Sequence, residues 1–134
     1  MNYSRQRSIV LDIMKTHYTH PTAEEVYEIA RKELPSIGIA TVYRNLNQLA
    51  EAGEIIKIPQ PGGVDRFDGR VEEHYHMRCP SCGKLEDLFV KEGQDMKALI
   101  ALACKTFGIK EDGRIGFGSV LMEKPCEKCR KALA

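Results

Sequence analysis

Residues 66–83 read RFDGRVEEHYHMRCPSCG, a stretch that carries two kinds of metal-binding side chain. The imidazoles of His74 and His76 are borderline nitrogen donors, whereas Cys79 and Cys82 are soft sulfur donors. Alternate residues of a β-strand share one face, so the His-Tyr-His step allows both imidazoles to reach one ion. Because ligand softness selects the metal, the stretch predicts two separate sites for two different ions.

The soft site can be completed by a second cysteine pair near the end of the sequence. Cys79-x-x-Cys82 and Cys126-x-x-Cys129 have the turn spacing that lets two thiolates hold one zinc ion, and a tetrahedral four-thiolate site needs two such pairs. Two redox dithiols or a chance disulfide are the alternatives, but neither pair has a thioredoxin-like βαβ context. We therefore predict a structural Zn²⁺ at these four thiolates, and a core position for the fifth cysteine, Cys104.

Carboxylates are the remaining candidates for the harder site. Asp68 ends a predicted hairpin, and Asp87 lies on the strand that follows the cysteine turn. Antiparallel pairing across that turn can place Asp87 beside the two histidines. A lone carboxylate on a strand is more often solvated, and His20 by itself reads as a loop histidine.

The composition is that of an ordinary soluble globular protein, with 134 residues of which 43% are hydrophobic and 29% are charged. No apolar run is long enough to span a bilayer and no signal-peptide core is visible, so we expect a cytoplasmic protein with no membrane partner. Thiols stay reduced in that compartment, which favours metal ligation over disulfides for the five cysteines.

The first 68 residues predict a winged helix-turn-helix. Amphipathic helices are expected over residues 3–16, 23–34 and 39–52. Thr22 and Glu25 form a capping box at the start of the second helix, and Gly53 stops the third. The following segment, EIIKIPQPGGVDRFD, has two short apolar runs about a Pro-Gly-Gly turn and predicts a β-hairpin. A small helical subdomain whose polar residues merely face water is the alternative.

Polar side chains in the first turns of the third helix are suited to phosphate and base-edge contacts, as in a recognition helix. The first helix adds basic residues near its ends. The predicted DNA contacts are Arg5, Arg7, Lys15, Thr41, Tyr43, Arg44 and Asn47. The net charge is only +1, so such a surface must come from local arrangement and not from bulk basicity.

The rest of the chain predicts a hinge over 69–73 and a small α/β dimerisation domain over 74–134, which makes the whole chain α+β. Strands are expected at 75–80, 84–90 and 114–124, forming a three-stranded antiparallel sheet. A helix is expected at 95–108, and a short helix at the end. About sixty residues make a thin core, so metal binding and oligomerisation are the expected reinforcements.

Five segments together resemble the ferric uptake regulator (Fur) family, in order and over nearly the whole chain. They are HPTAEEVY (20–27), ATVYRNLNQL (40–49), RFD (66–68), HYHMRCPSCGKLEDL (74–88) and CEKC (126–129). The resemblance implies a dimeric transcriptional repressor that binds double-stranded operator DNA. It assigns structural zinc to the four paired cysteines and a regulatory ion, Fe²⁺ or Mn²⁺, to His20, Asp68, His74, His76 and Asp87.

Within the family, iron-uptake regulators usually carry Glu at the positions of Asp68 and Asp87, whereas peroxide-sensing repressors (PerR) carry Asp at both. The resemblance therefore favours the peroxide-sensing branch, with His20 and His74 as the ligands open to oxidation. One ion bound by all five residues would fix the angle between the domains. An iron- or manganese-uptake regulator is the first alternative.

Two further alternatives come from other classes of protein. A small non-haem iron enzyme shares the histidine–carboxylate chemistry, but so short a chain shows no pocket-building fold. A protein-interaction module stabilised by zinc would bind no DNA, and the near-neutral charge of the N-terminal half mildly favours this alternative. We expect no enzyme and no small-molecule substrate beyond metal ions and H₂O₂.

Overall fold

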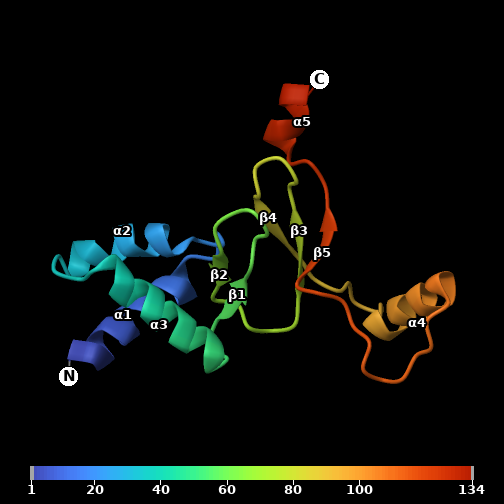
Figure 1. Ribbon diagram of the computed structural model, residues 1–134, viewed down its shortest axis with the longest axis horizontal. Helices are drawn as coiled ribbons and strands as arrows, with labels where there is room; N and C mark the ends of the chain where they lie inside the picture. The colour runs from blue at the N-terminus through green and yellow to red at the C-terminus, as the bar shows by residue number, and fades with distance from the viewer. Residues whose placement is uncertain (1, 134) are drawn as a thin grey trace. The chain divides into compact units, whose positions relative to one another are not determined.

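The computed structural model describes residues 2–133 and divides into two compact units, Met1–Glu72 and Glu73–Ala134. The first unit contains α1 (Asn2–Thr16), α2 (Ala23–Glu33), α3 (Ile39–Glu51), β1 (Ile56–Ile58) and β2 (Arg66–Asp68), as Figure 1 shows. The second contains β3 (Tyr75–Arg78), β4 (Leu85–Leu88), α4 (Met96–Phe107), β5 (Val120–Glu123) and α5 (Glu127–Leu133). None of the described helices is long and apolar enough to cross a membrane.

The first unit has the three helices and the hairpin of a winged helix. The capping box that opens α2 is present, since the Thr22 side chain accepts from the Glu25 amide and the Glu25 carboxylate accepts from the Thr22 amide. Strands β1 and β2 pair antiparallel, with Ile56 opposite Asp68. Gly62 adopts a left-handed φ of 72° in the loop between them, a conformation that favours glycine.

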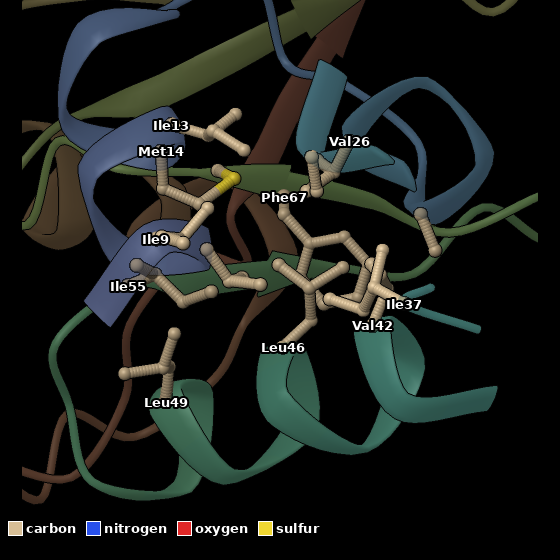
Figure 2. Close-up of a cluster of buried hydrophobic side chains, with 13 residues drawn as sticks. Ile9, Ile13, Met14, Val26, Ile37, Val42, Leu46, Leu49, Ile55 and Phe67 are labelled. Atoms are coloured by element: carbon tan, nitrogen blue, oxygen red, sulfur yellow. The ribbon is translucent and has the colours of Figure 1, made fainter. Parts of the chain in front are cut away.

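One apolar core unites these helices with the hairpin. Figure 2 shows Ile13 and Met14 of α1 facing Val26 of α2 and Leu46 of α3, with Phe67 of β2 among them. Phe67 is only 1% exposed, so its ring fixes the strand that carries Asp68 to the helical layer. Removing such a ring costs about 3–5 kcal/mol in a typical core.

The second unit has a three-stranded sheet in the order β4-β3-β5, with α4 between β4 and β5 in sequence. Asp95 caps α4 by accepting from the Lys97 amide, and Gly108 ends it with a left-handed φ of 67°. Cys104 is the one buried residue of α4, which agrees with its predicted core position. The apolar residues Leu102 and Phe107 on the same helix remain exposed within the single chain.

Two predictions for this sheet are wrong. Strands β3 and β4 are antiparallel as expected, but β5 runs parallel to β3, so the sheet is mixed. Parallel neighbours need a long crossover, and the chain from β3 to β5 passes through β4 and α4. The strand predicted over 114–124 is also shorter, since only Val120–Glu123 is extended in the sheet; glycines at 113, 116 and 118 weaken strand formation before it.

Candidate metal centres

The four paired cysteines meet because β3 and β5 are parallel. Cys79 directly follows β3, and Cys126 follows β5 after two residues, so both pairs leave the sheet at the same edge. All four sulfur atoms lie within 4.8 Å of one another. The Sγ atoms of Cys82 and Cys126 are 3.7 Å apart, close to the ~3.8 Å edge of a tetrahedron whose metal–sulfur bonds are ~2.3 Å. The donor set and its geometry therefore fit Zn²⁺.

Backbone amides prepare part of this cluster for ligation. The amide of Cys126, and then that of Cys82, lower the pKa of Cys79 from 9.0 to about 6 by hydrogen-bonding its sulfur. The pKa of Cys126 is also lowered, chiefly by the amide of Cys129. Hydrogen bonding to the other sulfurs, Cys126 first, raises the pKa of Cys129 to about 12. Amide donors favour the thiolate, which is the form that binds metal.

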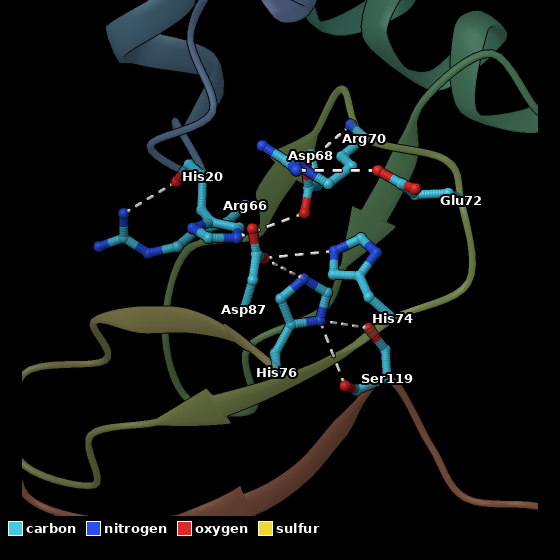
Figure 3. Close-up of polar contacts among 9 residues, drawn as sticks. All are labelled: His20, Arg66, Asp68, Arg70, Glu72, His74, His76, Asp87 and Ser119. Carbon is cyan, nitrogen blue, oxygen red and sulfur yellow. Dashed lines mark hydrogen bonds and ion pairs between the residues drawn. The ribbon is translucent and has the colours of Figure 1, made fainter. Parts of the chain in front are cut away.

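His20 and Asp68 form a pair within the first unit. The Nε2 atom of His20 lies 3.3 Å from Oδ2 of Asp68. The loop that carries His20 is fixed to β2, because the His20 carbonyl accepts from Arg66 Nη1 at 3.1 Å (Figure 3). The Pro21 carbonyl also accepts from the Phe67 amide, at 2.9 Å. His20 itself has a φ of 58°, a left-handed conformation that is uncommon for a non-glycine residue and is often found at functional sites.

His74, His76 and Asp87 form a second cluster, within the second unit. His76 of β3 and Asp87 of β4 are direct partners across the strands, as the antiparallel prediction expected. Oδ1 of Asp87 lies 3.2 Å from Nε2 of His74 and 3.4 Å from Nε2 of His76. The two Nε2 atoms therefore converge on one carboxylate oxygen, a borderline and hard donor set suited to Fe²⁺ or Mn²⁺.

The other ring nitrogen of His76, Nδ1, fixes the orientation of the imidazole ring. Its Nδ1 atom lies 2.9 Å from Oγ and 3.2 Å from the carbonyl oxygen of Ser119 (Figure 3). A carbonyl oxygen only accepts, so this contact favours a proton on Nδ1 and leaves the Nε2 lone pair for a metal. The His74 ring is held differently, by stacking on Phe89 with centroids 5.2 Å apart.

The side chains of the predicted DNA contacts differ in their exposure and in the contacts that they make within the chain. On α3, Tyr43 and Arg44 are exposed, and Arg44 makes a long contact of 3.4 Å with Thr41 Oγ1. Asn47 is half-buried and accepts from Lys57 of β1. On α1, Arg5 is exposed and Arg7 pairs with Glu54 at 3.2 Å.

Lys15 has an internal role that the sequence did not indicate. Its ammonium donates to the carbonyl oxygens of Glu54, at 2.8 Å, and of Gly69, at 2.6 Å. Ser119 was also missed, because its contact with His76 depends on the parallel pairing of β3 and β5. Asn45 was missed as well, although helical spacing from Val42 indicates that it faces inward. The residue is 1% exposed, and its side-chain amide has no hydrogen-bond partner among the described residues.

Known proteins similar to this chain include several peroxide-responsive repressors. The PerR protein of Staphylococcus saprophyticus is 33% identical over 94 residues, which cover 70% of this chain and 64% of that protein. The PerR protein of Staphylococcus aureus strain USA300 is 35% identical over 82 residues, covering 61% of this chain and 55% of that protein. The chain thus matches less than two thirds of the length of these relatives.

Solved structures extend the similarity over the whole fold. The Campylobacter jejuni peroxide stress regulator matches 96% of this chain and 91% of its own, with 36% identity and a TM-score of 0.71. The Helicobacter pylori ferric uptake regulator matches 94% of this chain and 80% of its own, with a TM-score of 0.75; at 23% identity it supports the fold alone. The sequence model described as the ferric uptake regulator family matches residues 1–110, and because this is most of the chain, the protein belongs to the ferric uptake regulator family.

Proposed function

We propose that this protein is a metal-dependent, DNA-binding transcriptional repressor that responds to peroxide. The observation that carries the proposal is the convergence of the His74 and His76 Nε2 atoms on Asp87, in a chain whose winged-helix unit holds a second His–Asp pair. Each set alone offers few ligands for a divalent ion. Together they would supply three imidazoles and two carboxylates for Fe²⁺ or Mn²⁺, alongside a structural Zn²⁺ on the four thiolates.

A shared ion explains how metal would control DNA binding. His20 and Asp68 belong to the unit with the recognition helix, and the other three ligands belong to the second unit. An ion bound by all five would limit the orientations of the two units. A dimer reads two half-sites only when its recognition helices have the right separation, so fewer orientations mean tighter operator binding. By thermodynamic linkage, operator DNA should tighten metal binding by the same factor.

The partner in that dimer would be a second copy of this chain. In the second unit, α4 presents Leu99, Leu102 and Phe107 to solvent, and Phe107 is 75% exposed. A helix with so much apolar surface is typical of an interface that a single chain leaves uncovered. Zinc on the terminal cysteines would fix α5 to the sheet and so stabilise this small dimerisation unit.

Peroxide is favoured over metal abundance as the signal for two reasons. Similar proteins named as peroxide regulators include the S. saprophyticus and C. jejuni proteins, and both carboxylates of the candidate site are Asp. A bound Fe²⁺ ion would supply the electron that reduces H₂O₂ beside its own ligands. His20 and His74 would then be the rings open to oxidation, which would weaken their ligation and release the operator.

Iron sensing is the second candidate function, since the Francisella tularensis ferric uptake regulator, solved with iron, is 25% identical over 93% of this chain. Mass spectrometry after one equivalent of H₂O₂ separates the two. Peroxide sensing predicts one added oxygen atom on the His20 or His74 peptide of Fe²⁺-loaded protein, none with Mn²⁺, and loss of the operator gel shift only with Fe²⁺. Oxidation confined to Met and Cys residues, with DNA binding retained, would favour iron sensing.

A further inference from the structure

We propose that Lys15, Gly69 and Arg70 form a latch between α1 and the start of the hinge, and that this latch positions the Asp68 carboxylate for metal. The three residues would act through Asp68 and are positioning residues. The metal-binding part of the proposal rests on the function proposed above, whereas the latch itself lies entirely within the first unit.

The two oxygens of Asp68 have different partners. Oδ1 accepts from the backbone amide of Arg70 at 2.9 Å, and Oδ2 faces Nε2 of His20 at 3.3 Å. The contact with the residue two positions on is an Asx-turn, which requires the short side chain of Asp or Asn. One oxygen is therefore occupied by the turn and the other points to the histidine, so that the carboxylate would ligate through Oδ2.

Gly69 lies directly against the end of α1. A Cβ atom at this position would collide with the carbonyl oxygen of Met14, so the close approach itself requires glycine. The carbonyl oxygen of Gly69 accepts from Lys15 Nζ at 2.6 Å. The same ammonium donates to the Glu54 carbonyl, just beyond α3, at 2.8 Å. Lys15 thus joins the end of α1, the segment after α3 and the hinge.

Arg70 adds a further contact with the segment that follows α1. Its guanidinium carbon lies 4.6 Å from the centroid of the Tyr18 ring, and its Nη1 atom lies 3.7 Å from Oε1 of Glu72 (Figure 3 shows the latter pair). A guanidinium over an aromatic face is attracted by the ring quadrupole. Both the backbone and the side chain of Arg70 are therefore held within the first unit.

The latch has two consequences for the proposed control of DNA binding by metal. The backbone through residue 70 moves with α1, so the pivot between the units shortens from the predicted residues 69–73 to residues 71–73. The Asp68 carboxylate is also ordered before an ion arrives, which lowers the entropic cost of binding. Loss of residues that orient a metal ligand commonly weakens metal affinity by roughly 10–100-fold.

The first test uses full-length, zinc-loaded protein without Mn²⁺, Fe²⁺ or DNA and measures tryptic cleavage after Arg70. Lys15→Met keeps the aliphatic stem but removes the donors, and Gly69→Ala introduces the clash with Met14. Both variants should be cleaved at least ~10-fold faster than wild type, because cleavage tracks local opening. Lys57→Met is the matched control, since Lys57 also bonds within this unit, to Asn47 and Asp65. It should be cleaved at the wild-type rate, and Lys15→Arg should restore protection.

The second test measures Mn²⁺ affinity by calorimetry on the zinc-loaded proteins. Lys15→Met and Gly69→Ala should bind Mn²⁺ about 10-fold more weakly, with zinc content and helicity unchanged, and Lys57→Met should bind as wild type. Wild-type cleavage rates in both latch variants would overturn the latch. Faster cleavage with unchanged Mn²⁺ affinity would overturn its positioning role. If Asp68→Ala binds Mn²⁺ as tightly as wild type, the five-ligand function fails, while the cleavage rates still decide the latch.

Discussion

Ser119→Ala tests how the protein orients a metal-binding histidine. Ser119 precedes β5 and offers two acceptors to Nδ1 of His76, its hydroxyl at 2.9 Å and its carbonyl oxygen at 3.2 Å. The substitution removes only the hydroxyl. The backbone hydrogen bond from the His76 amide to the Ser119 carbonyl, at 2.7 Å, does not depend on the side chain and should keep the strands in register.

The expected loss is small and follows from these contacts. One neutral hydrogen bond contributes about 0.5–1.5 kcal/mol, and about 1.4 kcal/mol corresponds to a tenfold change in affinity. Because the carbonyl oxygen still accepts from Nδ1, the Nε2 lone pair stays available to the ion. Mn²⁺ affinity should therefore fall by about two- to tenfold, far less than when the ligand itself is removed in His76→Ala.

Calorimetric titration of zinc-loaded protein with Mn²⁺ measures this difference. Thr106→Val is the matched control, because it removes another hydroxyl hydrogen bond of the same unit, from Thr106 to the Leu102 carbonyl on α4 at 2.7 Å. The control should bind Mn²⁺ as wild type. An unchanged affinity in Ser119→Ala, or a loss as large as that of His76→Ala, would refute the orienting role of this hydroxyl.

Three further predictions follow from other parts of the molecule. Cys79→Ser should abolish both chelator-resistant zinc and the dimer. In zinc-free wild type the thiolate absorbance should rise with a midpoint near pH 6, because the pKa of Cys79 is lowered from 9.0 to about 6. The free energy by which the Cys79 thiolate stabilises the folded protein is therefore fully present only above pH 9.0 and is lost as the pH falls through 6. Tyr43→Ala and Arg44→Ala should remove the operator gel shift with both metals still bound, and wild-type binding should weaken steeply with salt; a normal shift in both variants would exclude α3 as the reading helix. Asn45→Leu should stabilise the first unit by about 1–3 kcal/mol in thermal unfolding, since it replaces a buried amide without a hydrogen-bond partner, and a lowered melting temperature would show that the amide has one.

The elements of the first unit follow local signals, which is why the sequence predicts them well. The Thr22–Glu25 capping box fixes the start of α2, and the buried residues of α3 recur at helical spacing. In the second unit, the pairing of Asp87 with His76 is also set locally, because the short cysteine turn between β3 and β4 determines the register of the hairpin. Each of these features depends on residues close together in the chain.

Contacts between distant segments were not predictable in the same way. Lys15 looks like an exposed cation at the end of a helix, and only the folded chain brings the carbonyl oxygens of Glu54 and Gly69 to its ammonium. The need for glycine at position 69 is equally invisible in sequence, since it arises from the approach of Met14 and not from a turn. Sequence patterns indicate the face of an element on which a side chain lies, but not which backbone atoms from distant segments will contact it.

The position of β5 is different, because the sequence contained only part of the information: the predicted zinc site determines the direction of β5 but not which strand it pairs with. A four-thiolate site requires Cys79 and Cys126 to lie at the same edge of the sheet. Each cysteine comes just after a strand in the chain, β3 and β5 respectively, so both strands must end at that edge. Adjacent strands that end at the same edge are parallel, and β3 and β5 are adjacent. An antiparallel order β3-β4-β5 would satisfy the predicted zinc site equally well. It is therefore the observed adjacency of β5 to β3 that makes the pair parallel and places Ser119 beside His76, a ligand of the proposed regulatory metal.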